Sequence, residues 1–433
     1  MDDFKFLTSK NLKIKIISTK GYLNKIFIRN KKSKKIAPSK DKNKIEIKDI
    51  YNNPKTQIST KQIIIKKRNA GVDLLRILSM LGIVYTHILY DGKGISKYNR
   101  FKSEIINSYT YVFWHNNAFA LISGVVGYKS SKYCNLLYLW LCVVFYSVGI
   151  RYFFIKYKKV TSLNGELFQE YCPAISGRYW YFSSYFGMFI FLPVVNKGIQ
   201  DLNKPEFELV VISIFGIFAF WYNYINSKSD FFSMKSGNST IWLLCLYIMG
   251  SYIGKFHIGY IGIKRYIFNL ILFFIFLFFC YIHNKYSDYI ISDSCGAYKI
   301  KLINFLKKLM SNNLNSVIRT TQAILITLLF FRLKCNEYLS KIISFFGHLT
   351  FGVYLIHINR NTSKHYLNTF LIGESDNLTL REVMQMLILK SMKLFFECII
   401  IEYLRQLLFN ILRIRKICIS IEKIAFKIVS YKK

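Results

Sequence analysis

Long apolar segments, separated by short lysine-rich stretches, follow one another from residue 70 to residue 412. A helix needs about 20 consecutive apolar residues to cross the hydrocarbon core of a bilayer. The pattern therefore predicts an all-α, polytopic transmembrane bundle of about ten helices. We expect these helices at residues 69–90, 108–128, 136–155, 180–196, 207–226, 240–256, 264–283, 316–334, 342–359 and 386–412.

The two ends of the chain are basic and lack an apolar segment of that length. Residues 1–69 are expected to form a partly disordered cytoplasmic tail, and residues 413–433 a second basic cytoplasmic tail. Lysine and arginine hold flanking segments on the cytoplasmic side, and an even number of spans returns both termini to that side. Residues 70–412 then form the membrane domain of a multi-pass protein, which we expect in the plasma membrane.

The overall charge supports the membrane interpretation. The chain carries 61 lysine and arginine residues against 23 acidic residues, a formal net charge of +38. In a soluble protein this excess would favour nucleic acid as a partner, but here the cations lie in the tails and between apolar segments, beside anionic headgroups. We therefore expect membrane lipid as a partner and no nucleic acid. The nine cysteines form no C-x-x-C motif and no cluster with histidine, so no metal site is predicted.

The first apolar segment contains three residues that are costly in hydrocarbon: Asp73, Arg76 and His87. A charged side chain there costs several kcal/mol unless it faces a partner or a wet cavity. His87 follows Arg76 by about three helical turns, so both side chains lie on one face, with roughly 16 Å of rise between them. Asp73 lies one turn before Arg76, where its carboxylate can pair with the guanidinium group.

Four motifs occur in a fixed order along the chain. The first is VDLLRILSMLGIVYTH, which contains Arg76 and His87. It is followed by FALISGVVGY from Phe119, GRYWYFSSYFGMFIFLPVVNKG from Gly177 and FGHLTFGVYLIH from Phe346. Together the four resemble the signature of the acyltransferase-3 family of integral membrane acyltransferases, and the resemblance covers residues 70–412.

The resemblance implies an enzyme that takes an acyl group, most often acetyl, from cytoplasmic acyl-CoA. The acyl group goes to a hydroxyl of a cell-surface or lipid-linked glycan, with acyl-CoA as donor substrate and no bound cofactor. Two other functions can use the same polar stripe. One is a transporter or flippase of lipid-linked oligosaccharide, and the other is a membrane glycan polymerase.

His87 is the first candidate for the chemistry, because a neutral imidazole can remove a proton from a sugar hydroxyl that attacks a thioester. A histidine that only packs against a neighbouring helix is the alternative, and the resemblance favours the base. Arg76 offers a fixed charge and a planar fork that suit the phosphates of coenzyme A. A structural pair with Asp73 is an equally good interpretation, and the two are compatible.

The segment near residues 342–359 supplies a second imidazole, His357. Thr350, Tyr354 and His357 share one helical face, and His357 should reach the depth of His87, where the two rings can relay a proton. His348 points to the opposite side by the same geometry and is expected to be structural. In the last segment Glu402 is expected to neutralise Arg405, while Glu397 is left to orient an imidazole.

Five further residues are candidates for substrate or donor contacts. Trp114 can line a sugar site or anchor its helix at the interface, and His115 is a second candidate base. Ser123 either contacts the donor or allows close helix packing. Arg178 and Trp180 can stack on and hydrogen-bond an acceptor sugar, or belong to an interfacial aromatic belt.

Overall fold

The computed structural model describes residues 68–130, 132–158, 167–225, 230–256, 263–291, 308, 311 and 313–430. The described residues all belong to one compact unit, residues 67–433, and the account below concerns this unit. The predicted basic tail, residues 1–69, lies outside the described part except for Arg68 and Asn69.

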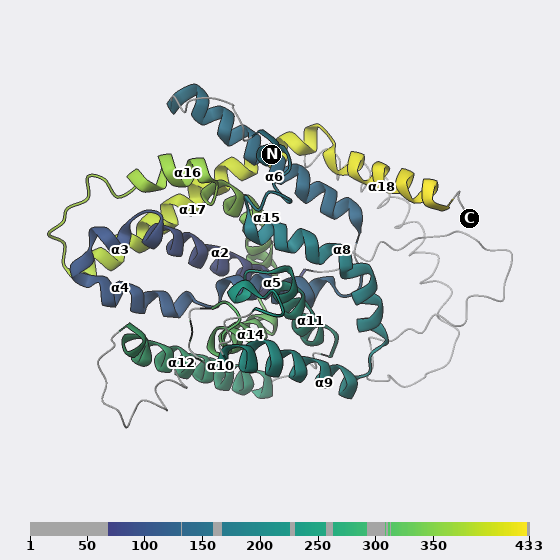
Figure 1. The fold of residues 1–433 in the computed structure, drawn as a ribbon, viewed down its shortest axis with the longest axis horizontal. Coiled ribbons are helices and arrows are strands. Elements are labelled where there is room, and N and C mark those ends of the chain that lie inside the picture. Colours follow the sequence, from purple (N-terminus) through teal and green to yellow (C-terminus); the bar gives the residue numbers. More distant parts are fainter. Residues whose placement is uncertain are drawn as a thin grey trace, which may run out of the picture. The chain divides into compact units, whose positions relative to one another are not determined.

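Every regular element in the described part is a helix, so the all-α prediction is confirmed (Figure 1). Among the described residues, six helical segments are long and apolar enough to cross a membrane. They are α2 (Ala70–Tyr90), α6 (Tyr133–Lys158), α8 (Trp180–Asp201), α9 (Lys204–Ile214) continued through a π-helical turn (Phe215–Trp221) into α10 (Tyr222–Ile225), α12 (Ile263–Ile291) and α15 (Glu337–His357).

The predicted count of about ten spans is not confirmed. Three of the expected segments fold as helices shorter than a full span: α5 (His115–Gly127), α11 (Thr240–Phe256) and α14 (Val317–Phe331). A fourth, α17 (Leu380–Ile411), is long enough, but lysine, glutamate and arginine interrupt its apolar sequence. The remaining elements are α3 (Gly94–Lys97), η2 (Asn99–Phe101), α4 (Lys102–Tyr109), η3 (Thr110–Val112), α7 (Leu167–Tyr171), η5 (Lys235–Gly237), α16 (Arg360–His365), η6 (Leu367–Thr369) and α18 (Ile414–Ser430).

Helix α2 lies at the boundary between two apolar cores and contributes residues to both. It packs against α5, α14, α15 and α17. Its first turns, through Val72 and Leu75, join a core built mainly from α5, α8, α11 and α14. Its later turns, from Met80 to Leu89, join a second core with α6, α15 and α17. The helix that carries the candidate chemistry is therefore fixed from both sides.

Close backbone contacts hold α5, which carries two candidate residues, against α11. A Cβ atom added at Gly124 would lie 2.0 Å from the carbonyl oxygen of Tyr247, and one added at Gly250 would lie 2.0 Å from that of Leu121. Only glycine allows the two backbones to approach this closely, as in other small-residue contacts between membrane helices. The close helix packing considered for Ser123 in the sequence analysis is thus made by the neighbouring residue, Gly124.

The two glutamates of α17 have different surroundings. Glu402 accepts hydrogen bonds from Arg405 Nη2 at 2.5 Å and from Tyr146 Oη at 2.7 Å, so the predicted buried Glu402–Arg405 pair is present. Glu397 was expected to orient an imidazole, and instead it accepts a hydrogen bond from Tyr366 Oη at 2.7 Å. Its side chain faces Tyr366, which lies between α16 and η6, rather than a histidine of α2. The carboxylate that orients the α2 imidazole is a different one, described below.

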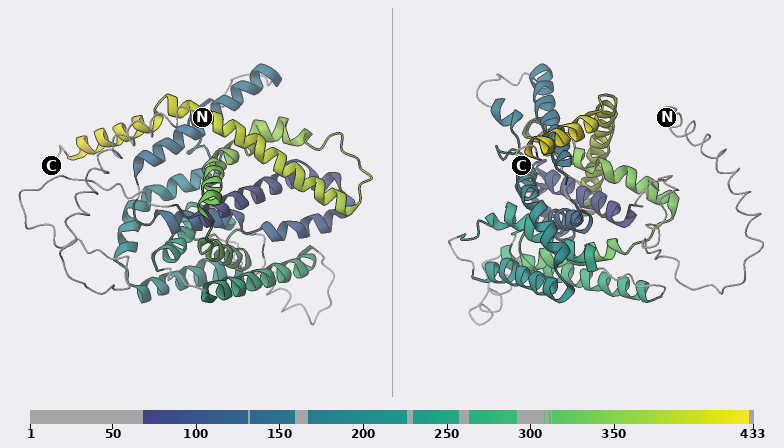
Figure 2. Two further views of the ribbon diagram at one scale, coloured as in Figure 1. Left: turned by 180° about the vertical axis from the view of Figure 1, so that it is seen from behind. Right: turned by 90° about the vertical axis from the view of Figure 1, so that its right-hand side faces the viewer.

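Residues 413–433 were expected as a basic tail, and most of them form the 17-residue helix α18. This helix lies along α6 (Figures 1 and 2). Glu422 fixes the contact by accepting a hydrogen bond from the backbone nitrogen of Cys134 at 3.1 Å. The C-terminal segment thereby reaches the candidate site.

Candidate active site in a cavity beside helix α2

A cavity of about 560 Å³ follows α2 from Arg76 to His87. Its walls come from α2, α5, α6, α8, α15 and α18, and both of those residues line it. This volume lies within the range of small-molecule sites in proteins. Of the predicted site residues, the lining includes Arg76, His87, His115, Ser123, Trp180 and Tyr354.

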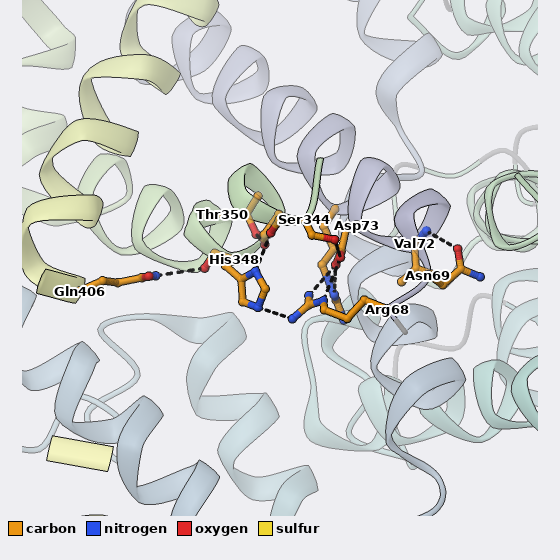
Figure 3. A network of polar contacts seen from close by, with 10 residues as sticks. Arg68, Asn69, Val72, Asp73, Ser344, His348, Thr350 and Gln406 are labelled. Atoms are coloured by element: carbon orange, nitrogen blue, oxygen red, sulfur yellow. Dashed lines mark hydrogen bonds and ion pairs between the residues drawn. The ribbon is translucent and has the colours of Figure 1, made fainter. Parts of the chain in front are cut away.

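A cluster of cationic side chains surrounds Asp73 at one end of the cavity. The Asp73 carboxylate accepts hydrogen bonds from Arg76 Nη1 at 2.5 Å and from Arg68 Nη2 at 2.6 Å, as well as from Ser344 Oγ at 2.9 Å (Figure 3). The predicted Asp73–Arg76 pair is therefore present. Gly347 makes room for it, because a Cβ atom there would lie 2.9 Å from Asp73 Cβ.

Two more residues extend this cationic end. His348 lines the cavity, and its Nε2 atom accepts a hydrogen bond from Arg68 Nη1, while its Nδ1 atom donates to the backbone oxygen of Ser344 at 2.5 Å. Arg415 enters from α18 and contacts Asn135 Oδ1 at 3.5 Å. Arg68 and Arg76 share the single Asp73 carboxylate, and Arg415 adds a third guanidinium group to the lining, so the cavity carries net positive charge.

The placement of His348 corrects the sequence-based expectation that it points away from the site. At about 100° per residue, His348 and His357 are separated by about 180° around α15, as expected. The cavity-facing sector of α15 is wide, however, and Thr350, Phe351 and Tyr354 occupy the angles between them. His348 and His357 therefore lie at the two edges of one wide face.

A carboxylate orients His87 at the other end of the cavity. The His87 Nδ1 atom lies 2.5 Å from Asp91 Oδ2, one turn further along the chain. A carboxylate oxygen only accepts hydrogen bonds, so Nδ1 carries the proton and Nε2 keeps its lone pair. The same hydrogen bond from His87 holds the pKa of Asp91, just beyond the apolar helix, below its ordinary value. Asp91 therefore stays ionised at neutral pH.

His357 is the nearest ring to His87. The two ring centroids are 5.3 Å apart with an interplanar angle of 67°. His357 is fully buried, and its Nδ1 atom donates to the backbone oxygen of Val353 at 2.6 Å. Its Nε2 atom has no hydrogen-bond partner among the described residues. The two imidazoles therefore lie side by side, as predicted. In each ring Nδ1 donates a hydrogen bond, so Nε2 carries no proton when the ring is neutral.

His115, the second candidate base, is buried in the same cavity wall and faces α2. Its Nε2 atom lies 3.1 Å from Thr86 Oγ1, whose own hydrogen is donated to the backbone oxygen of Gly82. His115 Nε2 is therefore the donor in this contact. A ring whose Nε2 atom donates its proton to Thr86 is less available as a base there than His87.

The other predicted residues divide between the cavity and its surroundings. Ser123 lines the cavity and donates to the backbone oxygen of Phe119 at 2.9 Å, and Trp180 and Tyr354 form part of the wall. Trp114 does not reach the cavity. It is buried in the first core, and its Nε1 atom donates to the backbone oxygen of Tyr111 at 2.9 Å. Its amphipathic ring packs inside the bundle rather than at an entrance.

Arg178 lines a second cavity, of about 690 Å³, on the other side of Asp91. Its Nη2 atom lies 2.6 Å from Glu170 Oε1, and its side chain is 6% exposed. The two cavities adjoin at Ile358, which lines both. Asp91 itself lines the second cavity, so the His87–Asp91 pair lies between the two.

Four residues of this arrangement were missed by the sequence reasoning. Asp91 had a readable signal, since it lies at i+4 from His87 and immediately after the apolar run. Arg68 precedes the run by one residue and had only its charge to mark it. His348 was missed because periodicity does not show how wide the cavity-facing sector of α15 is, and nothing local distinguished Arg415 from the other basic residues near the C-terminus. In the described residues no three His, Cys, Asp or Glu side chains gather as a metal site.

The geometry can support proton transfer and anion binding in one enclosed space. The imidazole end offers an unprotonated nitrogen whose conjugate acid is stabilised by Asp91. The guanidinium end offers planar donors suited to phosphate or carboxylate oxygens. Both ends lie on α2, about three helical turns apart.

Comparison with known families and proteins gives one match. A family model described as an acyltransferase domain, of the third acyltransferase type, matches residues 69–373, which is more than half of the chain. No curated protein matches the chain. No solved structure matches it. The matched range includes the α2 residues that line the two cavities, and it ends before α17 and α18.

Proposed function

Because the chain belongs to the acyltransferase-3 family, we propose that it is an integral membrane O-acyltransferase with acyl-CoA, most often acetyl-CoA, as donor. In this proposal the acceptor is a hydroxyl of a cell-surface or lipid-linked glycan. The family itself indicates an acyltransferase, and the long apolar helices of the described part indicate a membrane protein. To these two statements we add, as parts of the proposal, the donor, the acceptor and the roles of individual residues.

One observation carries the proposal: a single cavity joins a guanidinium cluster to a carboxylate-oriented imidazole. Arg68, Arg76 and Arg415 suit the pyrophosphate and 3′-phosphate groups of coenzyme A, which bear several negative charges. With those phosphates at the Arg76 end, the acyl thioester extends along α2 toward His87. The donor enters from the cytoplasm if the N-terminus is cytoplasmic, as the basic residues favour.

His87 then acts as general base. Its Nε2 atom takes the proton of the acceptor hydroxyl, and the oxygen attacks the thioester carbonyl carbon. The carbon–sulfur bond breaks, an ester bond has formed, and the thiolate takes the proton back from the imidazolium. Asp91 holds the ring and stabilises the imidazolium. His357, 5.3 Å away between ring centroids, is the second imidazole that positions or relays the proton.

Labelling with acyl-CoA tests this function. Membranes containing the full-length chain are given acyl-labelled acyl-CoA and a glycan acceptor, and label in the glycan is measured. We expect His87→Ala to reduce the rate by about 10²- to 10⁴-fold, the usual size of a general-base contribution. His365→Ala, which changes a histidine outside the first cavity, should leave the rate unchanged.

Donor use gives a second measurement on the same membranes. Arg76→Ala should raise the KM for acyl-CoA, because a charge-assisted hydrogen bond to phosphate contributes about 1.5–3 kcal/mol. Arg381→Ala, an exposed arginine of α17, is the control. Normal labelling by His87→Ala would remove His87 from the mechanism. A wild-type protein that moves or lengthens glycan without incorporating label would favour the transporter or the polymerase.

A further inference from the structure

The second cavity, like the first, is lined by several cationic side chains. Its lining includes Lys93, Arg178, Arg360 and Lys364, with Asp91 as the acidic member. Lys93 lies between α2 and α3, and Arg178 lies two residues before α8. Arg360 and Lys364 belong to α16. Positive charge has thus been gathered from three separate parts of the chain around one opening.

The acidic groups near this opening are already engaged. The Asp91 carboxylate accepts a hydrogen bond from His87 Nδ1 at 2.5 Å, and Glu170 contacts both Arg178, at 2.6 Å, and Arg151, at 3.1 Å. Lys93 and Lys364 are exposed and form no ion pair with a described residue. The lining therefore retains positive charge after these pairs are formed.

The arrangement of the cations has a cost in local stability. Arg360 and Lys364 lie one turn apart on α16, and like charges at i and i+4 destabilise an isolated helix. Lys93 has a backbone φ of +61°, a left-handed conformation that is uncommon for residues other than glycine. An anionic ligand would offset the repulsion, because charges that share a partly enclosed cavity focus its field on a ligand of opposite sign.

The position of the cavity relates it to the reaction. It adjoins the first cavity at Ile358, and the His87–Asp91 pair lies between the two. If the donor occupies the first cavity from the Arg76 end, the second cavity offers a separate approach to the end that holds His87. A molecule held there can extend a hydroxyl past Ile358 into the first cavity, which His87 lines, without passing the donor phosphates.

We propose that the second cavity is the acceptor subsite and that it selects an acidic acceptor, a glycan with a carboxylate or phosphate group close to the acylated hydroxyl. This inference rests on the proposed function. Arg178, held by Glu170, provides a fixed charge, whereas Lys93 and Lys364 follow the ligand on flexible chains. The hydroxyl gives its proton to His87 and forms the ester, and the acidic group remains unchanged on the product.

Binding to the purified full-length chain in detergent tests the subsite without requiring turnover. Two matched labelled oligosaccharides are compared, one with a glucuronate residue and one with glucose in its place. We expect the acidic form to bind about tenfold more tightly at low salt and to lose this preference at high ionic strength. The double variant Lys93→Gln/Lys364→Gln should reduce the preference and leave binding of the neutral form unchanged.

A control and a third ligand sharpen the measurement. Lys341→Gln, which removes an exposed lysine at the opposite end of α15, should keep the full preference. A neutral oligosaccharide on a polyprenyl pyrophosphate carrier separates the two sources of charge. If this ligand binds as tightly as the glucuronate form and responds to the double variant, the recognised anion is the carrier's phosphate. Equal binding of all three ligands, or a preference that survives the double variant, overturns the subsite.

Acyl transfer to the same ligands distinguishes this inference from the proposed function. A binding preference without any transfer of label would overturn the acyltransferase reaction and leave an anion site in place. Equal transfer to the acidic and neutral acceptors, together with equal binding, would overturn the subsite and leave the acyltransferase. Faster transfer to the acidic acceptor, lost in the double variant, supports both.

Discussion

Asp91 determines which nitrogen of His87 can act as a base. Without a hydrogen-bond acceptor at Nδ1, a neutral imidazole exchanges between two tautomers, and its ring rotates about two side-chain bonds. The 2.5 Å contact with Asp91 Oδ2 fixes both the tautomer and the ring orientation. Asp91 is therefore a positioning residue, acting on the substrates through His87.

Replacing Asp91 should consequently affect turnover more than binding. We expect Asp91→Asn to lower kcat by about tenfold or more, within the range of general-base contributions, with a small change in the KM for acyl-CoA. Asp91→Glu should restore part of the rate, because its carboxylate can still accept from Nδ1. Steady-state kinetics on labelled membranes give both constants. A raised KM with unchanged kcat would assign Asp91 to substrate binding instead.

At the residue scale, sequence reasoning succeeded where partners share one helix. Asp73, Arg76 and His87 were placed correctly because helical periodicity fixes their relative positions along α2. The meeting of His87 with His357 followed from depth alone, and the structure gives 5.3 Å between their rings. Arg415 could not be found in this way, because its position depends on how α18 packs against α6.

At the element scale, the α5–α11 contact holds His115 and Ser123 at the cavity. The approach depends on glycines, since a Cβ atom at Gly250 would lie 2.0 Å from the backbone oxygen of Leu121. The sequence marked the small residues of this contact, although their partner helix could not be identified from periodicity. The sequence predicted full-length spans for the segments that form α5, α11 and α14, but these helices are shorter than a full span. Close glycine contacts of this kind hold them within the bundle.

A single methyl group tests this contact. Gly250→Ala should force the two helices apart and lower the free energy of unfolding by about 1–3 kcal/mol, the usual cost of overpacking. Gly149→Ala is a matched control, because no atom lies within 4 Å of the added Cβ. Thermal unfolding of the purified protein in detergent measures the difference. Equal melting temperatures for the two variants would show that the contact at Gly250 relaxes without cost.

Helix α18 combines a lipid-facing pattern with a role at the donor end. Ile417, Ile421, Ile424 and Ile428 share one exposed face, and the lysines at 416, 423 and 427 share another. This distribution is typical of a helix that lies in the membrane interface, and we expect anionic headgroups beside its lysines. Arg415, at its start, lines the first cavity.

Arg415 and Lys416 are neighbouring cations with different surroundings, which makes them a matched pair. We expect Arg415→Gln to raise the KM for acyl-CoA, and Lys416→Gln to leave it unchanged. The effect should be smaller than that of Arg76→Ala, because Arg415 is exposed and water screens its charge. Titrating acyl-CoA in the labelling assay measures both. Identical behaviour of the two variants would mean that α18 contributes only a general positive field.

At the scale of the whole membrane unit, the two ends of α2 have different proposed roles, and we expect each end to face one side of the bilayer. The guanidinium cluster lies at the start of α2 and α15, and the second cavity lies beyond their ends. Acyl-CoA is a cytoplasmic metabolite in the proposed reaction, and the basic termini are expected on the cytoplasmic side. Both arguments give the same orientation, although they rest on different residues.

Accessibility of single cysteines tests that orientation. Lys341 and Asp376 have exposed side chains at opposite ends of the bundle, with exposures of 75% and 80%. A membrane-impermeant maleimide applied to intact cells should label Asp376→Cys above the level of the parent chain, and should label Lys341→Cys only after permeabilisation. The reverse pattern would turn the guanidinium cluster away from the cytoplasmic pool of acyl-CoA. The donor assignment would then fail, whereas the contact between His87 and Asp91 would be unaffected.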